Sequence, residues 1–137
     1  VSADVWSVTS FTELRRDGIE AERQNMLHPG AKPTLSYVEQ CLAKSEGPVV
    51  VSTDYMRSFA DQIRPYVPNT FVTLGTDGYG RSGSREALRN FFEVDRYHVV
   101  LATLKALADE GTIPASKAAE AIKKYKIDVN RPNPATI

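Results

Sequence analysis

The chain has 137 residues, 42% of them hydrophobic and 25% charged, which suits one globular domain with a sizeable core. Seventeen Lys and Arg residues balance seventeen Asp and Glu residues, so the formal net charge is zero. This balance argues against a nucleic-acid partner and against an anionic membrane surface, because both select an excess of basic residues.

Cysteine and histidine content narrows the class of protein further. The single cysteine, Cys41, excludes an internal disulfide and favours a reducing, cytoplasmic location. Two histidines and one cysteine, far apart in the sequence, argue against a zinc site. No apolar run approaches the roughly 20 residues of a membrane-spanning helix. These features predict a cytoplasmic domain with no membrane partner.

The chain begins with a predicted strand and a predicted helix. Residues 5–8 form a short β-rich run, and Trp6 within it is expected in the core. Ser10 and Glu13 then have the spacing of a capping box, which predicts a helix that runs to about Met26.

A second capping box and two strands follow. Ser36 and Glu39 predict a short helix that stops at residues 47–48. The continuous apolar run at 48–52 is typical of a strand buried on both faces in a parallel sheet. Residues 71–75 predict a further strand.

Between these strands the pattern predicts a helix over residues 55–66, with Asp54 as a candidate N-cap. Its apolar residues recur at three- and four-residue spacings, so they are expected to form one stripe that faces the sheet. The stripe comprises Tyr55, Met56, Phe59, Ala60 and Ile63.

Three further helices are predicted after the last strand. They cover about 84–91, 95–108 and 114–125, and Asp95 is the expected N-cap of the second. That second helix is apolar on most sides, so it is expected to pack against its own sheet and against another element. A C-terminal tail begins at about residue 127.

Strands that alternate with helices predict parallel βαβ units in a three-layer α/β/α domain. Residues 1–137 contain no repeat or linker that would divide them, so they are expected to form a single domain. Three clear strands are few for such a sheet.

One loop could form a binding site. It follows the strand at 71–75 and precedes a helix, which is where open α/β sheets place their ligands. Its candidate residues are Asp77, Gly78, Tyr79, Gly80, Arg81 and Ser82. Glycines allow the backbone to approach a ligand, and a guanidinium can hold a phosphate or carboxylate.

A purely structural interpretation of this loop stays open beside the functional one. The glycine spacing is neither a dinucleotide fingerprint nor a phosphate-binding loop. The glycines would then serve tight turns, and Arg81 would pair with a carboxylate or pack at an interface.

The histidines do not indicate a catalytic triad. His28 lies at the predicted end of a helix, where a cation complements the helix dipole, and His98 is expected to pack or to form a hydrogen bond. The chain has no Gly-x-Ser-x-Gly motif, which argues against a serine hydrolase. Asp54 is expected to cap a helix rather than to join a site.

Several segments taken together resemble the C-terminal domain of the homodimeric bacterial pyruvate dehydrogenase decarboxylating subunit. The resemblance extends in order along nearly the whole chain. It is carried by residues 5–14 (VWSVTSFTEL), 23–29 (RQNMLHP), 48–56 (PVVVSTDYM), 74–82 (LGTDGYGRS) and 91–95 (FFEVD). Residues 77–82 also resemble the Asp-x-Phe-Gly-x-Ser loop of transketolase C-terminal domains.

The resemblance implies a mostly parallel, mixed sheet of about five strands, with the first strand and helix of the family domain absent from this chain. It implies a parent enzyme that decarboxylates pyruvate with thiamine diphosphate and Mg²⁺ and passes the acetyl unit to a lipoyl group of dihydrolipoyl acetyltransferase. The cofactor and catalytic residues of the family lie in preceding domains. No cofactor is therefore expected on this chain, and its expected partners are those domains and the second subunit of a homodimer.

Three hypotheses follow. The chain is a non-catalytic, architectural C-terminal domain of such an enzyme, or a small-molecule module that binds phosphate or carboxylate through residues 77–84. In the third, exposed apolar surface drives assembly.

Overall fold

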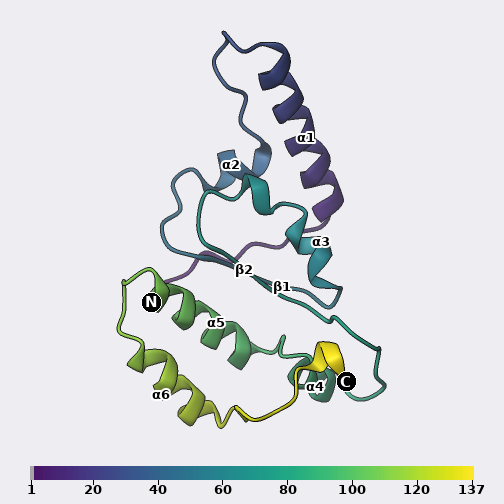
Figure 1. The fold of residues 1–137 in the computed structure, drawn as a ribbon, viewed down its shortest axis with the longest axis vertical. Coiled ribbons are helices and arrows are strands. Elements are labelled where there is room, and N and C mark those ends of the chain that lie inside the picture. The colour runs from purple at the N-terminus through teal and green to yellow at the C-terminus, as the bar shows by residue number, and fades with distance from the viewer. Residues whose placement is uncertain (1) are drawn as a thin grey trace. The chain divides into compact units, whose positions relative to one another are not determined.

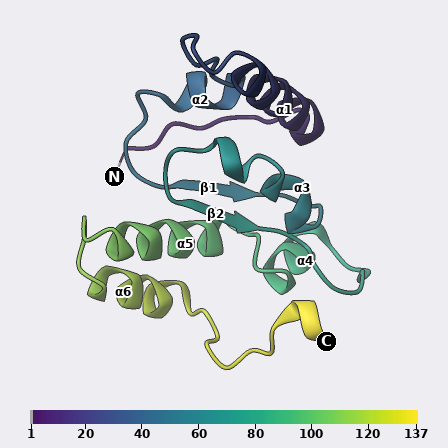
Figure 2. The same ribbon diagram turned by 45° about the horizontal axis from the view of Figure 1, so that its top comes forward.

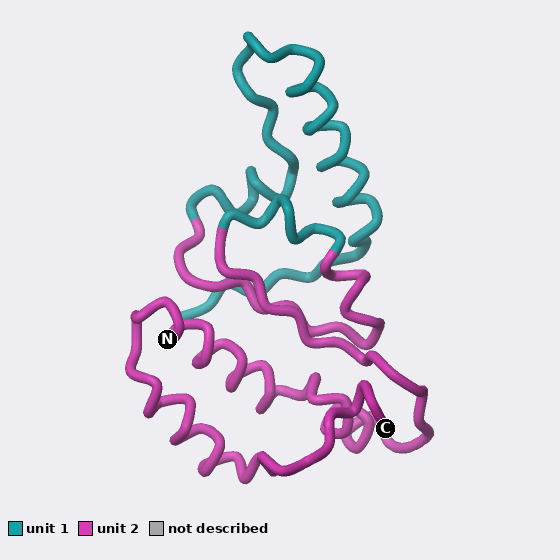
Figure 3. Tube along the Cα trace, viewed as in Figure 1, with its two compact units in different colours: residues 1–44, 62–68 teal, residues 45–61, 69–137 magenta. Residues whose placement is uncertain are grey.

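A computed structural model describes residues 2–137 (Figure 1). The contacts of the chain gather into two compact units (Figure 3). Unit 1 comprises residues 1–44 and 62–68, and unit 2 comprises residues 45–61 and 69–137. The organisation of residues 1–137 as a single domain stays a prediction.

The elements confirm most of the helices and two of the three strands predicted. In chain order they are α1 (Phe11–Leu27), α2 (Tyr37–Leu42), β1 (Val49–Ser52), α3 (Arg57–Asp61), the 3₁₀ turn η1 (Arg64–Tyr66), β2 (Phe71–Leu74), α4 (Arg85–Phe91), α5 (Arg96–Asp109), α6 (Ser116–Tyr125) and the 3₁₀ turn η2 (Pro134–Thr136). No helix among residues 2–137 combines the length and the hydropathy needed to cross a bilayer.

Unit 1 is built from α1, α2 and η1. The Ser10 hydroxyl accepts the Glu13 backbone N–H at 3.2 Å, which confirms the predicted N-cap of α1. The predicted capping box of α2 is also confirmed, because Ser36 and Glu39 each bind the backbone of the other. The three elements bury a small core in which the Tyr66 ring lies directly over one face of α1.

Unit 2 contains the sheet. Strands β1 and β2 pair in parallel, with Val49 opposite Phe71 and Ser52 opposite Leu74. Helix α3 contacts β2 on one face, where the Thr73 hydroxyl donates to Asp61, and α5 contacts both strands on the other face (Figure 2). Helix α6 packs against α5. This arrangement confirms the α/β class and the parallel pairing of the two strands that the structure describes.

The first predicted strand is wrong. Residues 2–8 form no strand, and the Trp6 side chain, expected in the core, is 59% exposed. A β-strand is stable only where a neighbour binds its backbone N–H and C=O groups. None of the strands that the structure describes pairs with residues 5–8. Residues 5–8 therefore form no strand despite their β propensity, because no strand that the structure describes binds their backbone.

The helix predicted over residues 55–66 is only partly correct. The structure has two short pieces, α3 and η1, and the apolar stripe is divided. Ala60 and Ile63 are buried, whereas Tyr55, Met56 and Phe59 remain exposed. The helix starts later than expected because residues 53–56 lie alongside the strand-end segment 74–77, where Thr53 and Tyr55 make backbone hydrogen bonds.

Candidate functional site: the loop after strand β2

The candidate loop lies at the carboxyl end of both strands, as the sequence predicted (Figure 2). It leaves β2 through Gly75, where an added Cβ would lie 2.8 Å from the Tyr55 carbonyl oxygen and from the Arg57 nitrogen. The Thr76 N–H donates to that same carbonyl at 2.9 Å. Two segments far apart in the sequence are thus held side by side at the edge of the sheet.

Asp77 is engaged within the protein. Its carboxylate accepts the backbone N–H of Arg57 at 3.1 Å and forms an ion pair with the Arg57 Nε at 3.2 Å. Because Arg57 is the first residue of α3, Asp77 binds a free N–H at the start of this helix from outside it. The carboxylate is therefore occupied by an internal partner.

Asp54 does not have the capping role that was expected. Its side chain pairs with Arg89 of α4 at 3.2 Å, and its backbone carbonyl accepts the Thr76 hydroxyl at 2.7 Å. Helix α3 begins at Arg57, three residues after Asp54. The free backbone N–H of Arg57 at this helix start is bound by Asp77 instead. The prediction that Asp54 caps the helix was wrong for this reason.

The next part of the loop is held by the C-terminal tail. Gly78 has φ +96°, a left-handed conformation that favours glycine. An added Cβ there would lie 2.8 Å from the carbonyl oxygen of Pro134. Pro134 is a buried residue of η2. Gly80, in contrast, has open space where a side chain would stand. Between them the Tyr79 side chain is 82% exposed.

Arg81 and Ser82 complete the candidate set. The guanidinium carbon of Arg81 lies 5.1 Å from the centroid of the Phe91 ring, a cation–π contact. This contact lies within the chain, so the predicted pairing of Arg81 with a carboxylate or its packing at an interface stays a prediction. Ser82 is exposed, and Ser84 caps α4 by accepting the Ala87 N–H at 3.2 Å. Of the six candidate residues in this loop, Asp77 already has a partner for its carboxylate, the neighbouring Arg57.

A second polar cluster surrounds the start of α5. Asp95 caps this helix as predicted and accepts both the backbone N–H and the Nδ1 of His98, at 2.9 and 2.7 Å. Burial alone would raise the pKa of Asp95, but the hydrogen bonds from His98 and Asn90 outweigh it and lower the pKa below its ordinary value. The predicted hydrogen-bonding role of His98 is confirmed. Sequence reasoning missed Arg131, which donates to Asn90 at 2.8 and 2.9 Å and connects the tail to α4.

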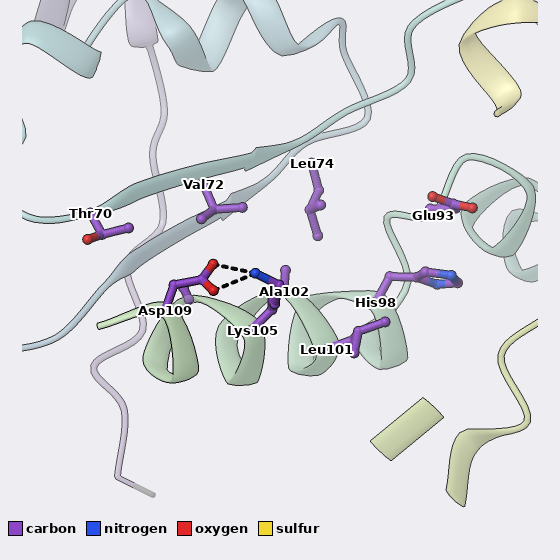
Figure 4. A pocket seen from close by; sticks show the side chains of 10 residues that line it. Thr70, Val72, Leu74, Glu93, His98, Leu101, Ala102, Lys105 and Asp109 are labelled. Atoms are coloured by element: carbon purple, nitrogen blue, oxygen red, sulfur yellow. Dashed lines mark hydrogen bonds and ion pairs between the residues drawn. The ribbon is translucent and has the colours of Figure 1, made fainter. Parts of the chain in front are cut away.

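A cavity lies in unit 2, between β2 and α5 (Figure 4). Its volume is about 350 Å³, and its walls are mainly apolar, with Val72, Leu74 and Leu101 among the residues that line it. Lys105 and Asp109 at its rim form an ion pair with each other. The cavity therefore offers apolar surface and few free polar groups.

Comparison with known proteins agrees with this architecture. The profile of the transketolase-like C-terminal domain matches residues 1–95. The chain is 59% identical over all 137 residues to a protein named "Pyruvate dehydrogenase E1 component" from Cupriavidus necator. Proteins of the same name from Pseudomonas aeruginosa and Escherichia coli are 62% and 53% identical over 98% of the chain. The chain spans about 15% of the length of these relatives. It belongs to the transketolase-like C-terminal domain family.

Proposed function

We propose that this chain is the C-terminal, architectural domain of a pyruvate dehydrogenase E1 component. The parent enzyme would decarboxylate pyruvate with thiamine diphosphate and Mg²⁺ and transfer the acetyl unit to the lipoyl group of dihydrolipoyl acetyltransferase. The observation that carries this proposal is the identity of 59% over the entire chain with a relative of that name. That identity extends over every helix and strand that the structure describes.

An architectural role is supported by the polar groups of the loop. Asp77 is bound to Arg57, and Gly78 is packed against the tail. These contacts give both residues a role in stabilising the fold. The proposed contacts of the domain are with the preceding domains of its own polypeptide and with the second subunit of a homodimer, in the cytoplasm.

The residues described do not fit a thiamine diphosphate and Mg²⁺ site. Within residues 2–137 no three His, Cys, Asp or Glu side chains gather where they could hold a metal ion. The cavity beside β2 has apolar walls that offer little to a diphosphate. We therefore assign no residue of this chain to the cofactor and derive no step through it.

Isothermal titration calorimetry tests this proposal. Thiamine diphosphate with Mg²⁺ is titrated into the 137-residue chain and, as the positive control, into the full-length protein that contains it. Binding by the full-length protein alone is expected. Micromolar binding by the 137-residue chain would overturn the architectural assignment.

The alternative is a module that binds phosphate or carboxylate through residues 77–84. The observation in its favour is that Arg81 and Ser82 remain exposed beside a glycine-rich backbone. A ligand that binds only the native state must raise its melting temperature. A panel of phosphorylated and carboxylated metabolites would then raise the melting temperature of the wild type, and Arg81→Ala would abolish the shift without loss of folding.

A further inference from the structure

The cavity between β2 and α5 has the size and the walls of a small-molecule site. Its volume of about 350 Å³ exceeds the roughly 150 Å³ that is sufficient to hold benzene in an engineered protein cavity. The apolar part of its lining comes from one strand and one helix, and comprises Val72, Leu74, Leu101, Ala102 and Ala106. Sites for small organic ligands are typically apolar cavities in which a few polar groups fix the orientation of the ligand.

Charged side chains lie on both sides of the cavity, and one of them has no counter-charge. Lys105 and Asp109 pair with each other near the end of α5, whereas Glu93 and His98 lie on the opposite side (Figure 4). His98 and Asp109 are about 16 Å apart along the axis of α5. Among residues 2–137, no Lys, Arg or His nitrogen lies within 4.0 Å of the Glu93 carboxylate. The lining therefore carries one uncompensated negative charge, on the side of His98.

His98 supplies a second acceptor on that side of the cavity. Its side chain is 10% exposed, and its Nδ1 lies 2.7 Å from the carboxylate of Asp95. Because an ionised carboxylate only accepts hydrogen bonds, the proton lies on Nδ1, and the Nε2 of the neutral ring is then an acceptor. Within residues 2–137 this Nε2 has no hydrogen-bond partner. The imidazole is thus held in one orientation with an acceptor left for a ligand.

Glu93 occupies a backbone position that favours glycine. Its φ is +58°, in the left-handed region, directly after the end of α4. Its N–H donates to the Asn90 carbonyl at 3.2 Å, and the Val94 N–H donates to the Arg89 carbonyl at 2.9 Å. Helices often end in a residue of this conformation, and it is usually glycine because a side chain is strained there. Strained positions that keep a side chain are concentrated at functional sites.

We propose that this cavity binds a small organic ammonium ion, with its apolar body between β2 and α5 and its ammonium group at Glu93 and the Nε2 of His98. An ammonium group has three N–H donors and a positive charge, so it can satisfy both acceptors and compensate the Glu93 carboxylate. The same carboxylate would repel an anionic ligand. This binding function is additional to the architectural role proposed above and does not depend on it.

Titrations followed by two-dimensional ¹H–¹⁵N NMR test the site with three probes that share one apolar body. The probes are 2-phenylethylamine, 2-phenylethanol and phenylacetate. The amine is expected to bind the 137-residue chain with a dissociation constant of about 1 mM or tighter and to shift the amide signals of residues 72–74 and 101–106. The alcohol should bind about threefold more weakly or worse, because it has no charge, and phenylacetate should bind most weakly.

Substitutions of Glu93 test the polar end of the site. Glu93→Gln should abolish the preference for the amine over the alcohol and leave the affinity for the alcohol unchanged. Glu93→Gly should also abolish the preference, with a melting temperature no lower than that of the wild type, because it relieves the left-handed strain. A loss of the preference in this variant cannot then result from a loss of folding.

Substitutions of alanine test the apolar part of the site. Ala102→Leu fills part of the cavity and should weaken the binding of the amine and of the alcohol about tenfold. Ala119→Leu, at an exposed position of α6, is the matched control and should leave both affinities unchanged. Arg81→Ala should also leave them unchanged, which distinguishes this cavity from the loop at residues 77–84.

The proposal would be overturned if millimolar amine shifted no amide signal of the cavity walls. Equal affinities of the wild type for the amine and the alcohol would also overturn it, as would a preference for the amine that persists in Glu93→Gln. The calorimetric test with thiamine diphosphate uses a different ligand, so either proposal can fail while the other stands.

Discussion

The carboxylate of Asp77 holds the first residue of a helix that lies twenty positions earlier in the chain. It accepts the Arg57 backbone N–H at 3.1 Å and pairs with the Nε of the same residue at 3.2 Å. One side chain thereby connects the loop after β2 to the start of α3. This pairing stabilises the edge of the sheet where the candidate loop lies.

Replacing Asp77 should separate its two contributions. Asp77→Ala removes both the capping acceptor and the charge, and we expect the free energy of unfolding to fall by about 1 kcal/mol, as for the loss of an N-cap. Asp77→Asn keeps an acceptor and should cost less, because the ion pair is partly exposed and contributes little. Urea denaturation measures both, with Glu46→Ala as the control at an exposed carboxylate. Equal losses for the Asn and Ala variants would contradict the capping role.

The two central glycines of the loop offer a matched pair. Gly78→Ala should destabilise the protein by more than about 1 kcal/mol, because an L residue is strained at φ +96° and its Cβ would meet the Pro134 carbonyl oxygen. Gly80→Ala stands in open space and should stay within about 0.5 kcal/mol of the wild type. Thermal denaturation of both variants decides this. Similar stabilities would show that the tail does not pack on the loop.

Gly18 leaves room for an aromatic ring in unit 1. An added Cβ would lie 2.2 Å from the Tyr66 Cε2, so Gly18→Ala should destabilise the protein by about 1–3 kcal/mol through overpacking. Within a helix the same substitution otherwise stabilises by up to about 1 kcal/mol. In a Tyr66→Ala background the sign should therefore reverse. The four proteins of this double-mutant cycle are compared by urea denaturation, and a Gly18→Ala variant more stable than the wild type would refute the packing.

The Asp95 carboxylate should make the free energy of unfolding depend on pH under acidic conditions. Its pKa is lower in the folded protein than the ordinary 3.8, so the unfolded state binds more protons in that range. The stabilisation is fully present above the ordinary pKa and is lost as the pH falls through the folded-state pKa.

Asp95→Asn cannot ionise and should lose most of this dependence. The stability difference between wild type and variant should therefore be largest near pH 6 and shrink below about pH 4. Urea denaturation from pH 3 to pH 6 measures it, and Glu46→Gln provides the comparison at an exposed carboxylate. A difference that is constant with pH would contradict the assigned role of the Asp95 carboxylate.

Much of the secondary structure was predictable because the responsible contacts are local. Ser10, Ser36 and Asp95 each accept an N–H no more than three residues away, so their sequence patterns were sufficient to place the helix starts. The two internal strands were predictable from their apolar runs. Residues 5–8 had an equally suitable composition, yet a strand also needs a partner, and composition does not reveal whether one is present.

The candidate loop was located correctly, but the partners of its side chains were not. Asp77 binds Arg57 across twenty residues, and Arg131 binds Asn90 across forty-one. Nothing in the spacing of these residues signals the pairing. Tyr55 and Phe59 have helical spacing and were expected to face the sheet, whereas the late start of α3 leaves them exposed.

Residue order and composition are sufficient to assign the class of domain, the family resemblance and the neutral charge that argues against nucleic acid. These depend on composition and on the order of residues along the chain. The carboxylate that caps α3, the glycine that contacts the tail and the aromatic side chains that face solvent became known from the three-dimensional arrangement of the chain. Each of these depends on the position of an atom far away in the sequence, because burial and hydrogen bonding are properties of neighbours in space.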